Sequence, residues 1–148
     1  MPNLVTTIKN AIKSKLDALV VQEILEEVQE DDFKISPVYN RDIAQYPAAV
    51  LTCPSIEADT LTNRDNLRTH VFDIVVIEKG ENVESVTQVE DLMENILNAF
   101  DNDPTLGGAA NGGVEPAIST PAPIVSKDKS LIVFVVTIKA KATKDLTF

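Results

Sequence analysis

The fold of this 148-residue chain is decided where a predicted helix ends and a long β region begins. The stretch reads Asn98-Ala99-Phe100-Asp101-Asn102-Asp103-Pro104-Thr105-Leu106-Gly107-Gly108. Pro104 cannot continue a helix, and it biases the backbone of the preceding residue away from helical angles. Gly107 and Gly108 supply the positive φ angles that a turn after a helix often requires. The sequence therefore predicts an abrupt helix end followed by strands.

Working outward from this turn, apolar residues at spacings of three and four predict two amphipathic helices. The first covers residues 3–17, with Asn3 as N-cap. Its apolar face consists of Leu4, Ile8, Ile12 and Leu16, and continues to Leu19. In the second helix, Ser85 and Gln88 have capping-box spacing. The apolar face of this second helix consists of Val86, Val89, Met93, Ile96, Leu97 and Phe100.

Four apolar segments are predicted as strands: residues 46–55, 67–78, 114–125 and 131–143. Residues 57–66 lack apolar periodicity and are predicted as a hairpin loop, whereas residues 31–45 are polar and predicted as a loop. The segment 114–125 contains prolines, which cannot donate to a β ladder, so it is placed at a sheet edge. These prolines are Pro116, Pro121 and Pro123.

The predicted strand 67–78 is apolar on both faces. One face carries Phe72, Ile74 and Val76, and the other carries Val71, Val75 and Ile77. Two helices, each ~10 Å wide, cover about four strands spaced ~4.8 Å apart, and only on one face. The second face therefore predicts a protein partner. The alternative is a twisted sheet whose far face is partly covered by the loop at residues 31–45.

Charge and composition narrow the functional classes. Thirteen Lys and Arg against 23 Asp and Glu give a net charge of −10, which argues against a protein that grips DNA. Acidic residues gather at 23–32 and 81–103, and lysines gather in the last strand. These groups are either solvated faces or edges where neighbouring copies meet. No secretory signal or membrane-length apolar run is visible, so we expect a soluble protein.

The residues that enzyme chemistry would require are scarce. His70 is the only histidine and lies in a predicted strand, so we interpret it as structural. Cys53, the only cysteine, has no activating motif and is interpreted as a small buried hydrophobe. The glycines at 107–113 lack the Lys-Ser/Thr of a phosphate loop, and residues 101–112 lack the Gly and Glu of a calcium loop. We predict no catalytic residue, no cofactor and no metal.

Three features together resemble one family: the order of elements, the strand start Tyr46-Pro47-Ala48-Ala49-Val50, and the Asp103–Gly108 turn. The family is the tail terminator (tail completion) proteins of long-tailed bacteriophages. The resemblance covers most of the chain and is weakest at residues 20–40. We therefore predict a single α+β domain, residues 1–148, with two helices packed on one face of a mostly antiparallel four- to five-stranded sheet. Residues 20–28 fit a helix or a strand, and the resemblance favours a short strand.

The resemblance also implies a function. In that family, subunits form a hexameric ring that binds the growing end of the tail tube, stops tube polymerisation and provides the surface for head-tail joining. The chain would then be a virion structural protein, assembled in the host cytoplasm and located at the head-proximal end of the tail. Its partners would be further copies of itself, the tail tube protein and a head-tail connector or neck protein, with DNA only passing through the lumen. The rival interpretations are a neck connector, a small enzyme and a ligand-binding domain.

Two groups of interaction residues are predicted as hypotheses. Loop residues that could contact the tube are Thr60, Leu61, Asn63, Arg64 and Asp65, and, as a competing contact, Gly107, Gly108 and Asn111. Long loops on rigid scaffolds often carry recognition, with Leu61 as an anchor and Arg64 as a carboxylate contact. Strand residues that could form the subunit interface are Val71, Val75, Ile77, Lys139 and Lys141.

Overall fold

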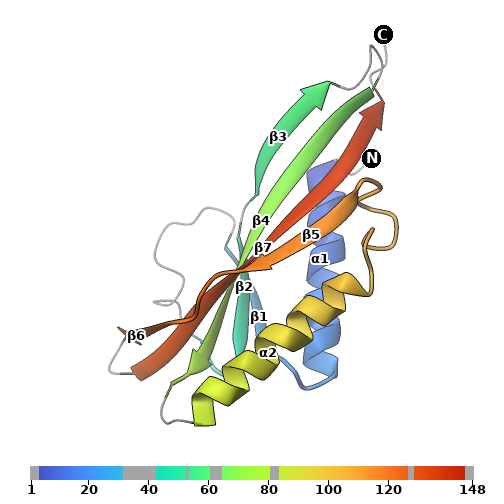
Figure 1. Ribbon diagram of the computed structural model, residues 1–148. Coiled ribbons are helices and arrows are strands. Elements are labelled where there is room, and N and C mark those ends of the chain that lie inside the picture. The colour runs from blue at the N-terminus through green and yellow to red at the C-terminus, as the bar shows by residue number, and fades with distance from the viewer. Residues whose placement is uncertain are drawn as a thin grey trace.

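The computed structural model describes residues 4–31, 43–52, 54–60, 65–80, 84–126 and 129–145. These ranges contain two helices and seven strands (Figure 1). The elements in chain order are α1 (Leu4–Val21), β1 (Glu27–Asp31), β2 (Ala48–Thr52), β3 (Ser55–Thr60), β4 (Asp65–Lys79), α2 (Glu84–Asp101), β5 (Gly113–Ile118), β6 (Ala122–Ser126) and β7 (Lys129–Asp145). The predicted α+β class is confirmed, but the sheet has more strands than the four to five expected.

The sheet is organised around one long ladder between β4 and β7. All fifteen residues of β4 pair with β7, from Asp65 opposite Asp145 to Lys79 opposite Leu131. The strand order is β1-β2-β4-β7-β5, with β3 paired to β4 and β6 paired to β7. Only β1 and β2 are parallel among the described pairs. β2 and β3 pair with successive parts of β4, and β5 and β6 pair with successive parts of β7. Each described strand except β1 therefore pairs directly with the β4–β7 ladder.

The sequence pattern predicted two segments of the sheet incorrectly. The predicted loop at 57–66 is wrong for most of its length, because residues 55–60 form β3 and β4 begins at Asp65. The sequence of β3, Ser-Ile-Glu-Ala-Asp-Thr, has little apolar periodicity, and Ile56 remains half exposed, so only the pairing with β4 reveals the strand. The predicted strand 114–125 is split into β5 and β6 around residues 119–121. Its predicted edge position is confirmed, since among the described strands β5 and β6 pair with β7 alone.

The segment between the first helix and the sheet also differs from expectation. Helix α1 extends to Val21 instead of residue 17, and the chain then turns through Glu23 at φ 62°. The short strand favoured at 20–28 lies later, at Glu27–Asp31, where the Glu26 N–H donates to the Pro47 carbonyl at 2.8 Å. Asn3 and residues 32–42 of the predicted loop lie outside the described residues. Ser85 is the second residue of α2, so it is not the predicted N-cap.

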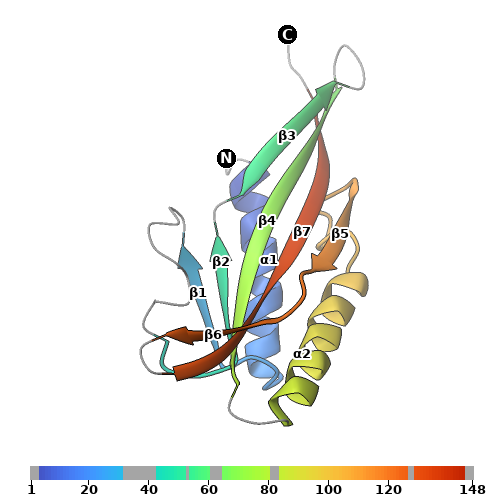
Figure 2. The same cartoon turned by 60° about the vertical axis from the view of Figure 1, so that its left-hand side comes forward.

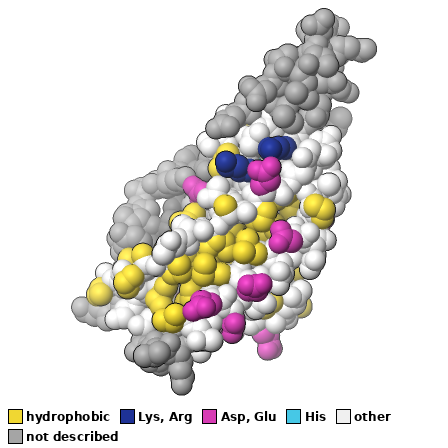
Figure 3. All heavy atoms as spheres, in the orientation of Figure 1, with side chains coloured by type: hydrophobic (Ala, Val, Ile, Leu, Met, Phe, Trp, Pro, Cys, Tyr) yellow, Lys and Arg dark blue, Asp and Glu magenta, His cyan; other side chains and the backbone are white. Residues whose placement is uncertain are grey.

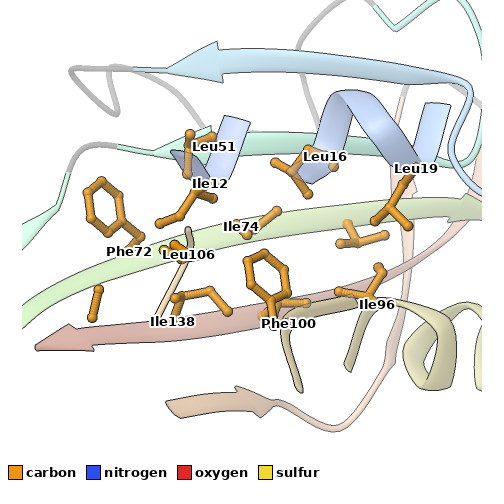
Figure 4. Packing of buried hydrophobic residues seen from close by; sticks show 14 of the residues in the cluster. Ile12, Leu16, Leu19, Leu51, Phe72, Ile74, Ile96, Phe100, Leu106 and Ile138 are labelled. Atoms are coloured by element: carbon orange, nitrogen blue, oxygen red, sulfur yellow. The ribbon is translucent and has the colours of Figure 1, made fainter. Parts of the chain in front are cut away.

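Both helices pack on the same face of the sheet, as the second view shows (Figure 2). The even-numbered side chains of β4 and β7 point toward them, because side chains alternate along a strand. The core joins these side chains to the apolar faces of the helices (Figure 4). Its buried members include Ile8, Ile12, Leu16, Phe72, Ile74, Ile96, Phe100, Phe134, Val136 and Ile138. The predicted two-helix layer is confirmed.

The turn after α2 has the geometry that its sequence predicts. The helix ends at Asp101, and Gly107 and Gly108 adopt φ angles of 66° and 96°. The Asp103 carboxylate accepts a hydrogen bond from the Gly107 N–H at 2.9 Å and forms an ion pair with Lys15 of α1 at 3.0 Å. These two contacts, the Gly107 N–H first, lower the pKa of Asp103. The turn is therefore tied to α1 as well as to its own helix.

Candidate interaction surface

The sheet face away from the helices is the surface on which a partner was predicted. We call it the far face and define it by the odd-numbered residues 71–77 of β4 and 133–139 of β7. Its side chains include four valines that are only partly buried: Val71, Val75, Val133 and Val135. The ladder places Val75 directly opposite Val135. This pairing puts aliphatic side chains next to one another on a rigid scaffold.

A polar group divides the far face. The Thr137 hydroxyl donates to the Asp73 carboxylate at 3.0 Å, and the two residues lie opposite each other in the ladder. The Thr52 hydroxyl donates to the Asp73 carbonyl at 2.8 Å. On one side of this group lie Val75 and Val135, and on the other lies Val71, opposite Lys139. The far face is therefore a patterned surface and not a continuous apolar plane.

One predicted interface residue is not available to a partner. Ile77 is completely buried in a small cluster that includes Ile43, Ala48 and Leu131. Ile43 belongs to the segment 31–45, so the alternative in which that segment partly covers the far face is confirmed at this end. The correction for Ile77 follows from chain connectivity, because the residues leading into β2 fold back over it. Val71 and Val75 keep part of their surface exposed.

The predicted basic and acidic edges are partly paired within the chain. Lys141 contacts Glu115 of β5 at 3.0 Å, whereas the side chain of Lys139 is exposed. Glu30, from the acidic block at 23–32, contacts Lys13 and Lys9 of α1 at 3.1 and 3.7 Å. Because Lys141 is paired with Glu115 within the chain, Lys139 is the better candidate for a contact between copies.

The described members of the two groups of predicted tube-contact residues lie along opposite edges of the central ladder. Thr60 ends β3 and Asp65 begins β4, while Leu61, Asn63 and Arg64 lie outside the described residues. Gly107, Gly108 and Asn111 are exposed in the turn between α2 and β5. Since β3 pairs with β4 and β5 pairs with β7, the described members of the two groups lie on different sides of the ladder (Figures 1 and 2).

The turn before β5 fits closely against β7. The Gly112 N–H donates to the Lys141 carbonyl at 2.8 Å, and a Cβ at Gly112 would lie only 2.9 Å from that same oxygen. Glycine is therefore required at this position by the close backbone approach. The same contact holds Asn111 beside the ladder.

His70 is buried within the sheet and has no exposed surface. Neither ring nitrogen has a hydrogen-bond partner among the described residues. Burial lowers the pKa of His70, and the neighbouring Arg68 charge acts in the same direction, against an opposing influence of the Ala140 backbone. With no exposed surface, this imidazole cannot reach a substrate for proton transfer. The predicted structural role remains the best interpretation. Cys53 lies outside the described residues.

Stability is expected to fall as the pH drops below about 6.5, the ordinary pKa of histidine. In that window the unfolded chain binds a proton at His70 while the folded chain does not, so protonation favours unfolding. The slope for one such group is at most about 1.4 kcal/mol per pH unit. Urea unfolding of the wild type and His70→Leu between pH 7.5 and 5.5 measures it. An equal slope in both proteins would assign the pH dependence to other groups.

Several site types find no support in the part of the chain that the structure describes. No group of three or more His, Cys, Asp or Glu residues is placed to hold a metal ion there. Neither described helix is long and apolar enough to cross a membrane. No protein-family model matches the chain, and no curated protein matches it either. The function must therefore be argued from the surfaces themselves.

The sequence pattern missed an apolar groove between α2 and the β5–β6 connection. It has a volume of about 450 Å³ and is lined by Val86, Val89, Glu90, Met93, Pro121, Pro123 and Ile132. Val86 was predicted to belong to the buried face of α2, but it is 53% exposed. The space-filling view shows a band of apolar side chains crossing this region, with acidic side chains beside it (Figure 3). In the sequence, the prolines indicated only a strand at a sheet edge, and no pattern predicted that they lie near α2.

Proposed function

We propose that this protein is a structural subunit of a long-tailed bacteriophage tail that assembles into a ring. The ring caps the tail tube, stops its polymerisation and provides a surface for head-tail joining. The proposal is supported by the resemblance described above and by the α+β arrangement of two helices on one face of a mostly antiparallel sheet. Six copies per ring are expected from the resemblance.

The observation that carries the proposal is the far face. Partly exposed valines on β4 and β7 lie on the longest ladder of the sheet and have no helix over them. Contiguous apolar surface that remains after a chain has folded is typical of sites that contact other proteins. Because β-sheet side chains are fixed by their ladder, such a face presents the same contacts in every copy, as a ring requires.

The mechanism that we infer is surface competition. A ring that binds the last layer of tube protein occupies the surface on which the next layer would add. It does not offer that surface again, so growth stops. DNA must pass through the lumen without being held, and a net charge of −10 suits this requirement because anionic surfaces repel phosphate.

The test is the molecular mass of the protein in solution, alone and with its tail tube protein. We expect a ring-sized assembly with the tube, even where the free protein is monomeric at low concentration. Electron microscopy should place it at one end of each tube. A single copy in assembled particles would refute the ring. Binding to a neck protein without any effect on tube length would instead indicate a neck connector.

Reversal of one lysine tests the contact between copies. If Lys139 meets an acidic group of the next copy, Lys139→Glu should reduce the assembled fraction about two- to fivefold at low salt, the range for an exposed ion pair. The loss should shrink at 1 M salt, where charges are screened within ~3 Å. Lys79→Glu is the matched control, since Lys79 is also exposed but ends β4, whereas Lys139 of β7 lies opposite Val71 near the middle of that strand. Equal losses in both variants would mean that Lys139 is only a solvated charge.

A further inference from the structure

We propose that the groove between α2 and the β5–β6 connection binds an amphipathic helical segment of a partner protein, apolar on one side and rich in Lys or Arg along its flank. This inference does not depend on the ring, because the groove lies on the helix side of the sheet and the far face lies on the other. It concerns the residues that line the groove and the charges beside it.

The lining of the groove is suited to aliphatic side chains. Six of its seven lining residues are apolar, and its volume falls within the usual range of binding pockets, about 300–1,000 Å³. On α2, Val86, Val89 and Met93 follow one another at spacings of three and four, so they form one wall about 10 Å long. Two turns of a partner helix can lie along such a wall.

The opposite wall favours a helix over an extended peptide. Pro121 and Pro123 have no backbone N–H, and this part of the chain therefore cannot provide a regular β ladder to an added strand. Recognition must then come from side chains entering the groove, which is how amphipathic helices bind. Ile132 of β7 supplies further apolar lining.

The charges around the groove specify the flank of the partner. Glu90 lines the groove, and Asp91 and Glu94 are exposed on the same helix, whose sequence contains no Lys or Arg. No Lys or Arg lines the groove among the described residues. The space-filling view places acidic side chains along the apolar band (Figure 3). A cationic flank would meet complementary charge, whereas an acidic one would be repelled.

A second carboxylate supports this choice of charge. Glu78 lies directly opposite Ile132 in the β4–β7 ladder, so both side chains are on the helix side of the sheet. Burial raises the pKa of Glu78, against the opposing effect of the Lys79 backbone N–H and charge. A Lys or Arg brought close to it would stabilise the charged carboxylate. Ile132 lines the groove, so a basic side chain of the partner that reaches past Ile132 to Glu78 would meet a second carboxylate in addition to Glu90.

The probe is a fluorescein-labelled synthetic peptide of about 14 residues, with Leu along one helical face and Lys on the other positions. Fluorescence anisotropy measures its binding to the full chain. A peptide of the same composition in scrambled order is the first control, and a version with Glu in place of Lys is the second. We expect the amphipathic Lys peptide to bind most tightly, with both controls at least about tenfold weaker.

Two pairs of matched variants locate the site. Val86→Glu puts a charge into the apolar groove and should weaken binding at least about tenfold, because a buried unpaired charge is unfavourable. Val21→Glu makes the same change at a residue that is 83% exposed and does not line the groove, and it should have no effect. Glu90→Lys should weaken binding about two- to fivefold at low salt, and Glu26→Lys should not.

Three results would overturn the proposal. The scrambled peptide could bind as tightly as the amphipathic one, which would indicate adsorption to an acidic protein. Val86→Glu could match Val21→Glu, which would place binding elsewhere. Val86→Glu could instead change the mass of the protein without peptide, and the groove would then be occupied by a second copy. Because Val86 is half exposed, the variant should fold, and circular dichroism checks this.

Discussion

Leu106→Ala is expected to lower the free energy of unfolding by about 2–5 kcal/mol, the range for a buried leucine replaced by alanine. Leu106 is only 5% exposed, although it lies in the turn that ends α2. It belongs to the main core cluster and lies close to Phe72 and Ile138 in the packing view (Figure 4). Chemical denaturation of wild type and variant measures the loss.

The positive φ angle of Leu106 allows a second substitution to test the same prediction. Its φ of 52° lies in the left-handed region, which costs a residue with a side chain roughly 1–2 kcal/mol. Burial of the leucine offsets that cost, whereas alanine keeps the strain and loses the burial. Leu106→Gly relieves the strain, so its loss should differ from that of Leu106→Ala by no more than about 1 kcal/mol despite the larger deletion.

An exposed neighbour provides the control. Thr105 precedes Leu106 in the same turn and is exposed, so Thr105→Ala should change stability by no more than about 0.5 kcal/mol. A similarly small effect of Leu106→Ala would show that the turn is not part of the cooperative core. The conformation of the turn would then depend on its glycines and on the contacts of Asp103, and not on burial of Leu106.

Tubes of uncontrolled length are the second large effect expected, and this result rests on the proposed function. The double variant Leu61→Ser, Arg64→Ser changes the chain between β3 and β4. It removes the side chain predicted to anchor in the tube protein and the side chain predicted to contact a carboxylate there. The fold should persist, because the two substitutions change no described residue: β3 ends at Thr60 and β4 begins at Asp65. A cap that no longer binds the tube should allow growth beyond the normal length. Electron microscopy of assembled tubes measures the length distribution.

The competing contact is tested on the other edge of the ladder. Gly108→Asn combined with Asn111→Ser changes two exposed positions, and Asn tolerates the positive φ of Gly108 better than other residues with a side chain. Normal tubes with the Leu61/Arg64 variant and overlong tubes with this variant would move the tube contact to the turn before β5. Normal tubes with both would remove both loops from the proposed interface.

Local chemistry explains what could be predicted from the sequence. The end of α2 was predicted because Pro104 and the two glycines act through their own backbone, independently of the rest of the fold. The helices were predicted because Ile8, Ile12 and Leu16 repeat with the period of a helix. The helix-covered face of β4 was predicted in the same way, from alternation along the strand. Each of these features is encoded in residues that are close together in the chain.

Features that depend on contacts with another segment of the chain could not be predicted in this way. Strand β3 forms because β4 offers hydrogen bonds to it, and its own sequence gives little sign of this. Ile77 is buried because Ile43 returns over the far face. Val86 remains half exposed because it lines the groove that separates α2 from Pro121 and from Pro123 of β6. The partners of Ile77 and Val86 lie more than 30 positions away in the chain. β4 follows β3 directly, but the sequence of β3 alone does not show the pairing.

The order in which the central ladder is synthesised has a consequence for when the protein can act. β4 pairs with residues roughly 50–80 positions further along the chain, in β7. At translation speeds of about 5–20 residues per second, the apolar β4 waits for several seconds before its partner leaves the ribosome. Contacts this distant also close slowly, because the loop entropy is lost before the pairing is gained. The far face includes β7 residues 133–139 and the groove includes Ile132 of β7, so neither surface is complete before β7 has been synthesised. Partner binding is thereby restricted to chains whose translation has passed the last strand.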